Sequence, residues 1–466
     1  MTAKKTARKP ARNTARTRTP RELTNPLRHV TSINDLTDDE IEKIFAAAAR
    51  YLKELGHPSV KHRIARSART ASGKILATLF YEPSTRTRLS FESAALRLGG
   101  GTISSSDPAT SSAAKGESLA DTVRVVSNYA DILVIRHPRD GAAKLAAEFA
   151  GIPVINGGDG SHEHPTQTLC DLFTLQQEKK SLKNLNVVIS GDLKGSRTIH
   201  SFVYALARFR ANIMLMPGGM GMGLPEHVDW RLRNEFHSHP VPKSESEKAQ
   251  ARKQTDIDVI YKTADQPHQL ALIPVKDEID IFYMTRFQKE RWTEGQRNDY
   301  LKVDRLFLEE EKYKHASVLH PLPRVGELDM DLDEMPRAAY FRQAAYGVPV
   351  RMALIAAMLD LDKRTSLRKF EGGFDASDYP IHIQPRGLGT VCLNKNCITH
   401  DEHDGAYTDN KFYIVKKDGI RLRCFYCETD NDDVVAGHKN GETAFFASGA
   451  MAAKAGYTPP RVAAAE

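Results

Sequence analysis

The chain has 466 residues, which is enough for two or three domains with ordinary hydrophobic cores. Its formal net charge of +7 lies in residues 1–24, where eight basic side chains stand against only Glu22, so the rest of the chain is neutral overall. No apolar run approaches the ~18 residues that span a bilayer, and the N-terminus lacks the apolar core of a secretory signal. We therefore exclude membrane and secreted classes and expect a cytoplasmic protein.

Residues 1–24 are predicted to form a disordered basic tail. The segment is rich in Thr, Ala, Pro and Arg and poor in apolar residues. Loose contact with a polyanion is one alternative. An organelle transit peptide, which is also Arg-rich and poor in acids, is another.

The first structured element is predicted to be a helix over residues 38–52, with Thr37 as its N-cap. From there, apolar strand-like segments alternate with helix-like segments. Strands are expected at 75–80, 132–135, 154–155, 187–190, 213–216, 279–284 and 318–319, and helices at 89–98, 118–129, 142–149, 166–178, 198–207 and 343–361. This alternation predicts an α/β fold with parallel sheets, whose ligands bind at the carboxyl ends of the strands.

The most informative motif is the run Ser84-Thr85-Arg86-Thr87-Arg88, between a predicted strand and a predicted helix. Hydroxyls, guanidiniums, free N–H groups and the helix dipole would all point at one spot there, which suits a phosphate dianion. Polar residues also follow four other predicted strands, at 136–138, 192–194, 285–286 and 320–324. The sequence thus predicts one ligand site built from several strand ends.

Four cysteines near the C-terminus form a two-knuckle pattern, Cys392 with Cys397 and Cys424 with Cys427. Thiolates supplied as two close pairs suit a tetrahedral structural zinc ion. Two disulfides or free thiols are the alternative, which the cytosolic character of the chain disfavours.

The motifs together resemble those of carbamoyltransferases. Residues 80–92 are similar to the carbamoyl-phosphate signature of that family, and the match continues at 115–122, 136–138, 164–167, 191–193 and 320–324, within residues 25–361. Residues 283–291 resemble the aspartate-binding loop of aspartate carbamoyltransferases, whereas the Ser-Met-Gly and His-Cys-Leu-Pro motifs of ornithine carbamoyltransferases are lacking. A dicarboxylic amino acid also needs cations, which Arg197, Arg286 and Arg291 supply.

The resemblance implies two parallel-sheet α/β domains and a small zinc-ribbon-like domain with four cysteine ligands. We expect a carbamoyl-phosphate domain at residues 25–165, an aspartate domain at 166–338, and a return helix at 339–361 that packs on the first domain. A linker at 362–389, the zinc domain at 390–440 and a loosely ordered tail at 441–466 follow. The segment 220–274 looks longer and more divergent than in the family.

For carbamoyl phosphate, the resemblance implies that Ser84, Thr85, Arg86 and Thr87 bind the phosphate. Arg88 either joins them or forms an internal salt bridge.

The carbonyl oxygen would be polarised by Arg136, His164 and Thr87. Gln167 and the backbone of Leu322 and Pro323 would contact the carbamoyl amide. Arg86, Thr87, Arg136 and His164 are the expected catalytic residues, whereas His137 and His162 are given structural roles.

For aspartate, Arg197 would bind the α-carboxylate, and Arg286 with Gln288 the side-chain carboxylate. In the family, a Ser and a Lys reach into the neighbouring subunit's site, which implies a homotrimer or a dimer of trimers. The Lys corresponds to Lys115 and the Ser to Ser111, with Ser112 as the alternative. The amine would attack directly and the phosphate would accept its proton, so no catalytic cofactor is expected.

The cysteine segment resembles the zinc domain of the aspartate carbamoyltransferase regulatory chain, here fused to the catalytic chain. About 28 residues precede it, too few for the nucleotide-binding domain that normally stands there, so that effector site is predicted to be absent. The zinc domain is expected to stabilise contacts between catalytic chains.

The resemblance implies an enzyme of pyrimidine biosynthesis that converts carbamoyl phosphate and L-aspartate to N-carbamoyl-L-aspartate and phosphate. A carbamoyltransferase for another amino acid is the first alternative. A zinc-containing nucleic-acid-binding protein and an inactive scaffold are alternatives from other classes.

Overall fold

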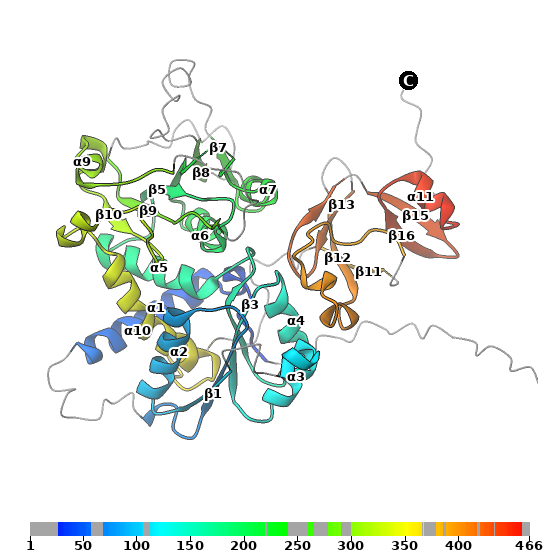
Figure 1. Cartoon of the computed structure of the whole chain (residues 1–466), viewed down its shortest axis with the longest axis horizontal. Helices are drawn as coiled ribbons and strands as arrows, with labels where there is room; N and C mark the ends of the chain where they lie inside the picture. Colours follow the sequence, from blue (N-terminus) through cyan, green and yellow to red (C-terminus); the bar gives the residue numbers. More distant parts are fainter. Residues whose placement is uncertain are drawn as a thin grey trace, which may run out of the picture.

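The computed structural model describes residues 27–56, 69–105, 112–219, 221–240, 259–263, 278–289, 300–365, 367, 379–384, 388–416, 420–432 and 434–458. The basic tail, Ser111, Arg291 and much of the predicted linker lie outside these residues. The described part forms two α/β lobes and a smaller β-rich domain (Figure 1). None of the helices in that part is long and apolar enough to cross a lipid bilayer.

The first lobe is built on a parallel four-stranded sheet with the order β2-β1-β3-β4. Its strands and the helices around them are β1 (Ile75–Phe80), α2 (Thr85–Arg97), β2 (Gly101–Ser105), α3 (Leu119–Val126), β3 (Ile132–His137), α4 (Ala142–Phe149) and β4 (Val154–Asp159). Strands β3 and β4 are buried along their whole length, as expected for parallel strands covered on both faces. The sequence did not predict β2, because this edge strand is partly exposed and reads Gly-Thr-Ile-Ser-Ser.

The second lobe has a six-stranded sheet with the order β10-β9-β5-β6-β8-β7. Its elements are β5 (Asn186–Gly191), α6 (Arg197–Arg208), β6 (Asn212–Pro217), α7 (Glu226–Asn234), β7 (Ser238–Pro240), β8 (Val259–Thr263), β9 (Ile281–Met284), α9 (Arg305–Leu308) and β10 (Ser317–Leu319). The first four strands in that order are parallel, whereas β8 pairs antiparallel with β6 and β7. The predicted parallel α/β fold is therefore confirmed, with an antiparallel edge that lies in the divergent segment 220–274.

Three helices join the two lobes: α1 (Asp38–Leu55), α5 (Pro165–Lys179) and α10 (Tyr340–Met358). The predicted N-cap of α1 is confirmed, since the Thr37 hydroxyl accepts from the Glu40 N–H at 3.2 Å and the Glu40 carboxylate accepts from the Thr37 N–H at 2.9 Å. One hydrophobic core runs through these helices and includes side chains from both sheets. Figure 1 shows α5 between the lobes, with α1 and α10 beside it.

The third domain combines an antiparallel sheet, β11-β12-β13-β14, with a hairpin of β15 and β16. Its elements are β11 (Ile381–Gln384), β12 (Asn410–Lys416), β13 (Ile420–Cys424), β14 (Asp430–Asn431), β15 (Val435–Lys439), β16 (Glu442–Phe446) and α11 (Gly449–Lys454). We call residues 379–458 the cysteine domain.

Two expectations about this domain are wrong. Part of the predicted linker forms β11, which pairs with β12. Part of the predicted loose tail forms β16 and α11, because Phe446 and Tyr457 are buried against each other and the Thr390 N–H donates to the Phe445 carbonyl at 2.7 Å. Its Ala- and Gly-rich composition concealed these aromatic anchors.

Candidate active site and metal centre

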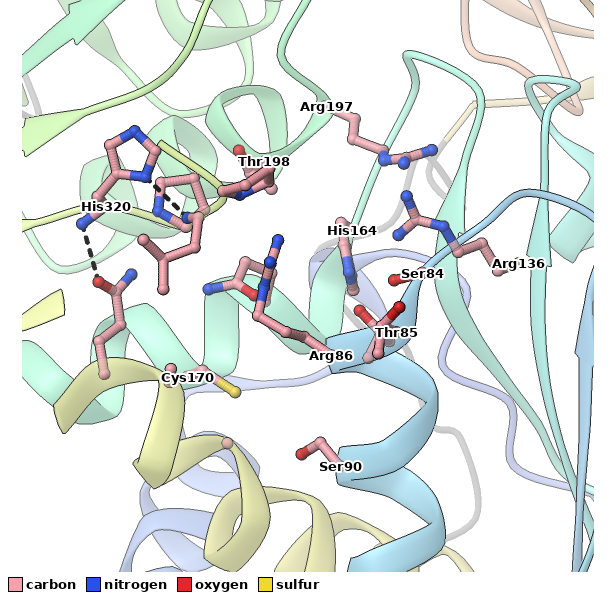
Figure 2. A pocket seen from close by; sticks show the side chains of 18 of the residues that line it. Ser84, Thr85, Arg86, Ser90, Arg136, His164, Cys170, Arg197, Thr198 and His320 are labelled. Atoms are coloured by element: carbon pink, nitrogen blue, oxygen red, sulfur yellow. Dashed lines mark hydrogen bonds between the residues drawn. The ribbon is translucent and has the colours of Figure 1, made fainter. Parts of the chain in front are cut away.

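A cavity of about 810 Å³ lies between the lobes, at the carboxyl ends of both sheets. Residues from several separate segments line it, among them Glu82, Ser84, Thr85, Arg86, Thr87, Arg136, His164, Gln167, Arg197, Arg286, Gln288, Leu322 and Pro323. The fold thus brings together most of the substrate residues predicted from the sequence. Lys115 does not line the cavity, and Ser111 and Arg291 lie outside the described residues. Figure 2 shows the cavity, with Arg86 facing Arg136 and Arg197 across it.

The N-terminus of α2 forms one wall of the cavity. Ser84 is the N-cap residue, and its side chain makes no capping hydrogen bond. The first-turn N–H groups of α2 are therefore not capped by that hydroxyl, and they add to the positive end of the helix dipole. Burial lowers the pKa of Arg86, and repulsion by the charge of Arg286 lowers it further. An anion would relieve this repulsion.

Arg88, two residues further on, does not line the cavity. Its Nε lies 3.7 Å from the Glu92 carboxylate, one helical turn away. Of the two outcomes that the sequence left open for Arg88, the structure shows the internal salt bridge.

His164 stands at the N-terminus of α5 and is 4% exposed. Burial, followed by the charges of Arg136 and Arg197, lowers its pKa well below the usual value for histidine. The imidazole is therefore neutral at neutral pH, and it can donate one N–H to a carbonyl oxygen. The two histidines with predicted structural roles are engaged locally: His137 accepts from the Arg139 N–H at 3.1 Å, and His162 Nδ1 lies 3.1 Å from the Asp159 carboxylate.

The wall opposite α2 comes from the second lobe. Arg197 begins α6, and Arg286 and Gln288 follow β9. The loop after β9 is fixed by the Asp192 carboxylate, which accepts from the Gln288 N–H at 3.1 Å. Two arginines and one glutamine of the second lobe thus face the N-terminus of α2 in the first lobe.

Leu322 and Pro323 lie in the loop after β10, and the bond between them is cis. His320 holds this loop, because its Nδ1 accepts from the Leu322 N–H at 2.8 Å and its Nε2 lies 2.7 Å from the Glu327 carboxylate. Figure 2 marks hydrogen bonds of His320 with dashed lines.

The four cysteines of the third domain converge on one point. Cys392 Sγ lies 3.4 Å from Cys427 Sγ, and Cys397 Sγ lies 3.8 Å from Cys424 Sγ, with all four sulfur atoms within 4.8 Å of one another. A tetrahedral metal with bonds of about 2.3 Å to sulfur needs sulfur atoms roughly 3.8 Å apart, so the four side chains fit such an ion. A disulfide needs about 2.05 Å between sulfurs. The disulfide alternative is therefore wrong for these residues.

The cysteine domain packs on both lobes of its own chain. Asn394 and Asn396 donate to the Asp140 carboxylate of the first lobe at 2.7 and 3.1 Å. Glu428, next to a metal-site cysteine, accepts from Lys144 of the first lobe at 2.9 Å and pairs with Arg231 of the second. These contacts lie within one chain. That the domain also stabilises contacts between catalytic chains stays a prediction.

Comparisons with known proteins agree with this geometry. The model of the carbamoyl-P binding domain of aspartate/ornithine carbamoyltransferase matches residues 28–177, and the model of the Asp/Orn binding domain matches residues 183–358. The chain belongs to the aspartate/ornithine carbamoyltransferase family. A third model, the metal binding domain of the aspartate carbamoyltransferase regulatory chain, matches residues 386–434 of this carbamoyltransferase.

Individual relatives point the same way. The aspartate carbamoyltransferase catalytic subunit of Picrophilus torridus is 44% identical over 335 residues, 71% of this chain and 97% of that protein. The catalytic subunit of the M. jannaschii aspartate transcarbamoylase is 39% identical with a TM-score of 0.56, and the match covers 72% of this chain and 99% of that one. The Trypanosoma cruzi aspartate transcarbamoylase, solved with N-(phosphonacetyl)-L-aspartic acid, is 32% identical with a TM-score of 0.54, over 70% and 94% of the two chains.

Glu82 lies inside the matched carbamoyltransferase signature, but its role in the site was not predicted from the sequence. Its carboxylate accepts from Arg136 at 3.0 Å and from Arg197 at 2.9 and 2.8 Å. Arg197 also donates to the Gly160 carbonyl at 2.8 Å. The available signal in the sequence was an acidic residue next to the basic run Ser84 to Arg88. The partners of Glu82 could not be inferred, because they lie on other segments.

Lys115 ends a short 3-10 helix, Ser112–Lys115, and is exposed. Within the described residues, it does not line the cavity of its own chain. Its contribution to a neighbouring subunit, together with Ser111, stays a prediction.

Proposed function

We propose that this carbamoyltransferase transfers the carbamoyl group of carbamoyl phosphate to the amine of L-aspartate. The products are N-carbamoyl-L-aspartate and phosphate, in pyrimidine biosynthesis. One observation carries the proposal: a helix N-terminus with Arg86 faces Arg197 and Arg286 across a single cavity. A phosphate at one end and two carboxylates at the other match that distribution of cations.

At the phosphate end, Ser84, Thr85, Arg86 and Thr87 would bind the dianion through hydroxyls, N–H groups and a guanidinium. The phosphate would relieve the repulsion between Arg86 and Arg286 that lowers the pKa of Arg86. It leaves as the carbonyl is attacked, and it can accept the amine's proton directly. No protein nucleophile is required.

At the carbonyl, Arg136, His164 and the Thr87 hydroxyl would donate to the oxygen as negative charge develops on it. A neutral His164 donates an N–H without adding a second fixed cation beside Arg136. These donors are held before substrate arrives, Arg136 by Glu82 and His164 by its place at the start of α5. Proximity and preorganised charge would therefore supply most of the rate enhancement.

At the amino-acid end, Arg197 would bind the α-carboxylate, and Arg286 with Gln288 the side-chain carboxylate. Arg197 is paired with Glu82, so aspartate would compete with that carboxylate for the guanidinium. A substrate with a cationic side chain would instead meet Arg286.

Lys115 and Ser111 would complete the site from a neighbouring subunit, in a homotrimer or a dimer of trimers. The position of Lys115, exposed and outside the cavity of its own chain, supports this assignment. Sedimentation of the full chain would measure the oligomer.

Zinc is the metal we assign to Cys392, Cys397, Cys424 and Cys427, since four thiolates in a closed tetrahedral set are typical of structural zinc. All four side chains are buried, so the ion would have a structural role and no part in catalysis. The cytoplasmic location stays a prediction.

The decisive experiment measures carbamoyl transfer from labelled carbamoyl phosphate to a panel of amino acids. We expect turnover with aspartate, and tight inhibition by the bisubstrate analogue N-(phosphonacetyl)-L-aspartic acid. Higher turnover with ornithine or another amino acid would overturn the substrate assignment and favour the first alternative.

The nucleic-acid-binding alternative has its own test. Any affinity for polyanions should disappear after deletion of residues 1–24, because the rest of the chain is neutral overall. Affinity that survives the deletion would support a binding role for the rest of the chain.

A further inference from the structure

Asp171 is a buried carboxylate in contact with the cavity wall, and it has no role in the chemistry described so far. It lies on α5, one helical turn after Gln167, and its side chain is fully buried. Its Oδ1 accepts from Gln167 Nε2 at 2.7 Å and from Gln343 Nε2 at 2.6 Å, and its Oδ2 accepts from the Tyr283 hydroxyl at 2.9 Å. Three elements, α5, α10 and β9, therefore meet at one carboxyl group.

An ionised carboxylate can only accept hydrogen bonds, so it decides which way both amides point. Each glutamine must turn its NH2 group toward Asp171. For Gln343 the consequence is visible, because its Oε1 then accepts from the His320 N–H at 2.9 Å. For Gln167, which lines the cavity, Oε1 is the polar atom that remains for a ligand.

We propose that Asp171 strengthens the site's selection of an amide over a methyl group, by fixing Gln167 with its carbonyl oxygen toward the substrate. Oε1 of Gln167 accepts an N–H from the carbamoyl NH2 and has no favourable contact with a CH3 in the same place. This selection rests on the proposed function, because it assumes that carbamoyl phosphate binds in this cavity. Asp171 acts through Gln167 and is a positioning residue.

The ionisation of Asp171 gives the proposal a pH dependence. Burial raises the pKa of Asp171 to about 6, against the three hydrogen bonds that it accepts and the charge of Arg351 on α10. The other titratable groups facing it are the Tyr283 hydroxyl on β9 and the Cys170 thiol on α5, and burial raises the pKa of both. Below about pH 6 the protonated carboxyl becomes a donor, and one of the two amides is then free to turn over.

Acetyl phosphate is the probe, because it carries the same phosphate and replaces NH2 with CH3. The ratio of its inhibition constant to the KM of carbamoyl phosphate measures the selection and cancels effects on the shared phosphate. In Asp171→Asn we expect the KM of carbamoyl phosphate to rise about 10-fold, the loss of roughly one oriented hydrogen bond, with the inhibition constant of acetyl phosphate within about 2-fold. The ratio in wild type should fall as pH drops through about 6, and it should be independent of pH in the variant.

Two further variants separate positioning from folding. Thr174→Val removes a buried hydroxyl on the same helix, which donates to the Cys170 carbonyl at 2.7 Å and does not line the cavity, so the ratio should not change. Tyr283→Phe leaves both amides in place but removes a hydrogen-bond donor that lowers the pKa of Asp171. The fall of the ratio at low pH should therefore begin at higher pH in this variant. This shift is measurable even if Asp171→Asn does not fold.

A double substitution gives the sharpest outcome. In a Gln167→Ala background, Asp171→Asn should raise the KM of carbamoyl phosphate little further, because the residue through which Asp171 acts is gone. The proposal would be overturned if Asp171→Asn weakened carbamoyl phosphate and acetyl phosphate equally. It would also be overturned if the effects of Asp171→Asn and Gln167→Ala on KM were fully additive. If wild-type enzyme makes no N-carbamoylaspartate, the proposed function itself fails, whatever the ratio shows.

Discussion

Two carboxylates in this molecule each hold cations from separate parts of the chain, and they differ in what surrounds them. Glu82 lies in the substrate cavity between Arg136 and Arg197, and its side chain is 27% exposed. Glu428 belongs to the cysteine domain and lies between Lys144 and Arg231 of the two lobes, and its side chain is 3% exposed. The arginines around Glu82 can therefore exchange that carboxylate for a ligand. The buried contacts of Glu428 serve only to hold the domains together.

The same contrast extends to the two centres. The cavity gathers groups from several segments of two lobes, and its cations are arranged around space for an anion. The metal centre draws its ligands from two short knuckles of one domain, and all four are buried. Substitutions in the cavity should therefore change kinetics with little loss of stability, and substitutions at the metal centre or its interface should do the reverse.

The largest kinetic effect should follow Arg86→Ala. Arg86 lines the cavity, whereas Arg88, two residues away, is paired with Glu92 and provides a matched control. Removing the Arg86 cation, which would contact the reacting phosphate, should lower kcat/KM about 10²- to 10³-fold. The kcat/KM of Arg88→Ala should stay within a few fold of wild type, because a partly exposed i,i+4 pair outside the cavity contributes little. Steady-state assays of both variants decide it, and equal losses would contradict the assignment.

Cys424→Ser should have the largest structural effect. A structural metal can contribute ~10 kcal/mol to a small domain, so losing one of four ligands should release the ion and loosen residues 379–458. We expect about one zinc per chain in wild type and a large loss in the variant, measured by elemental analysis, with faster proteolysis of the domain. Unchanged metal content would refute the ligand set. Residual activity should exceed that of Arg86→Ala.

Local motifs made much of this predictable from sequence. The run Ser84 to Arg88 and the cysteine pairs carry their chemistry within a few residues, and apolar strands next to helices indicated the fold. Glu82, Asp171 and Glu428 were missed as contacts, because each depends on partners far away in the chain. Glu82 and Arg197, for instance, are 115 positions apart and meet only when both sheets are formed. No periodicity contains that information.

Glu428→Gln should destabilise the folded chain with little direct effect on chemistry. Burial opposes ionisation, but Arg231 and Lys144 hold the pKa of Glu428 well below its usual value. Removing the charge leaves those cations poorly paired, at a cost of ~3 kcal/mol in the free energy of unfolding. Because the folded pKa is lowered, this stabilisation is complete above the unfolded pKa of about 4.3 and fades as pH falls below it. Urea unfolding at pH 7 and pH 4 should show the difference between variant and wild type shrinking at the lower pH.

The smallest effect expected is that of Glu82→Gln, the counterpart in the open cavity. A neutral amide offers one acceptor where the carboxylate accepts from two guanidiniums, so Arg136 and Arg197 should be less well oriented. We expect kcat/KM for aspartate to fall about 10-fold, the loss of about one charge-assisted hydrogen bond, with the free energy of unfolding nearly unchanged. An improved KM for aspartate would instead mean that Glu82 acts chiefly as a competitor that the substrate must displace. Either result, set beside Glu428→Gln, tests whether exposure decides if a carboxylate between two cations serves binding or folding.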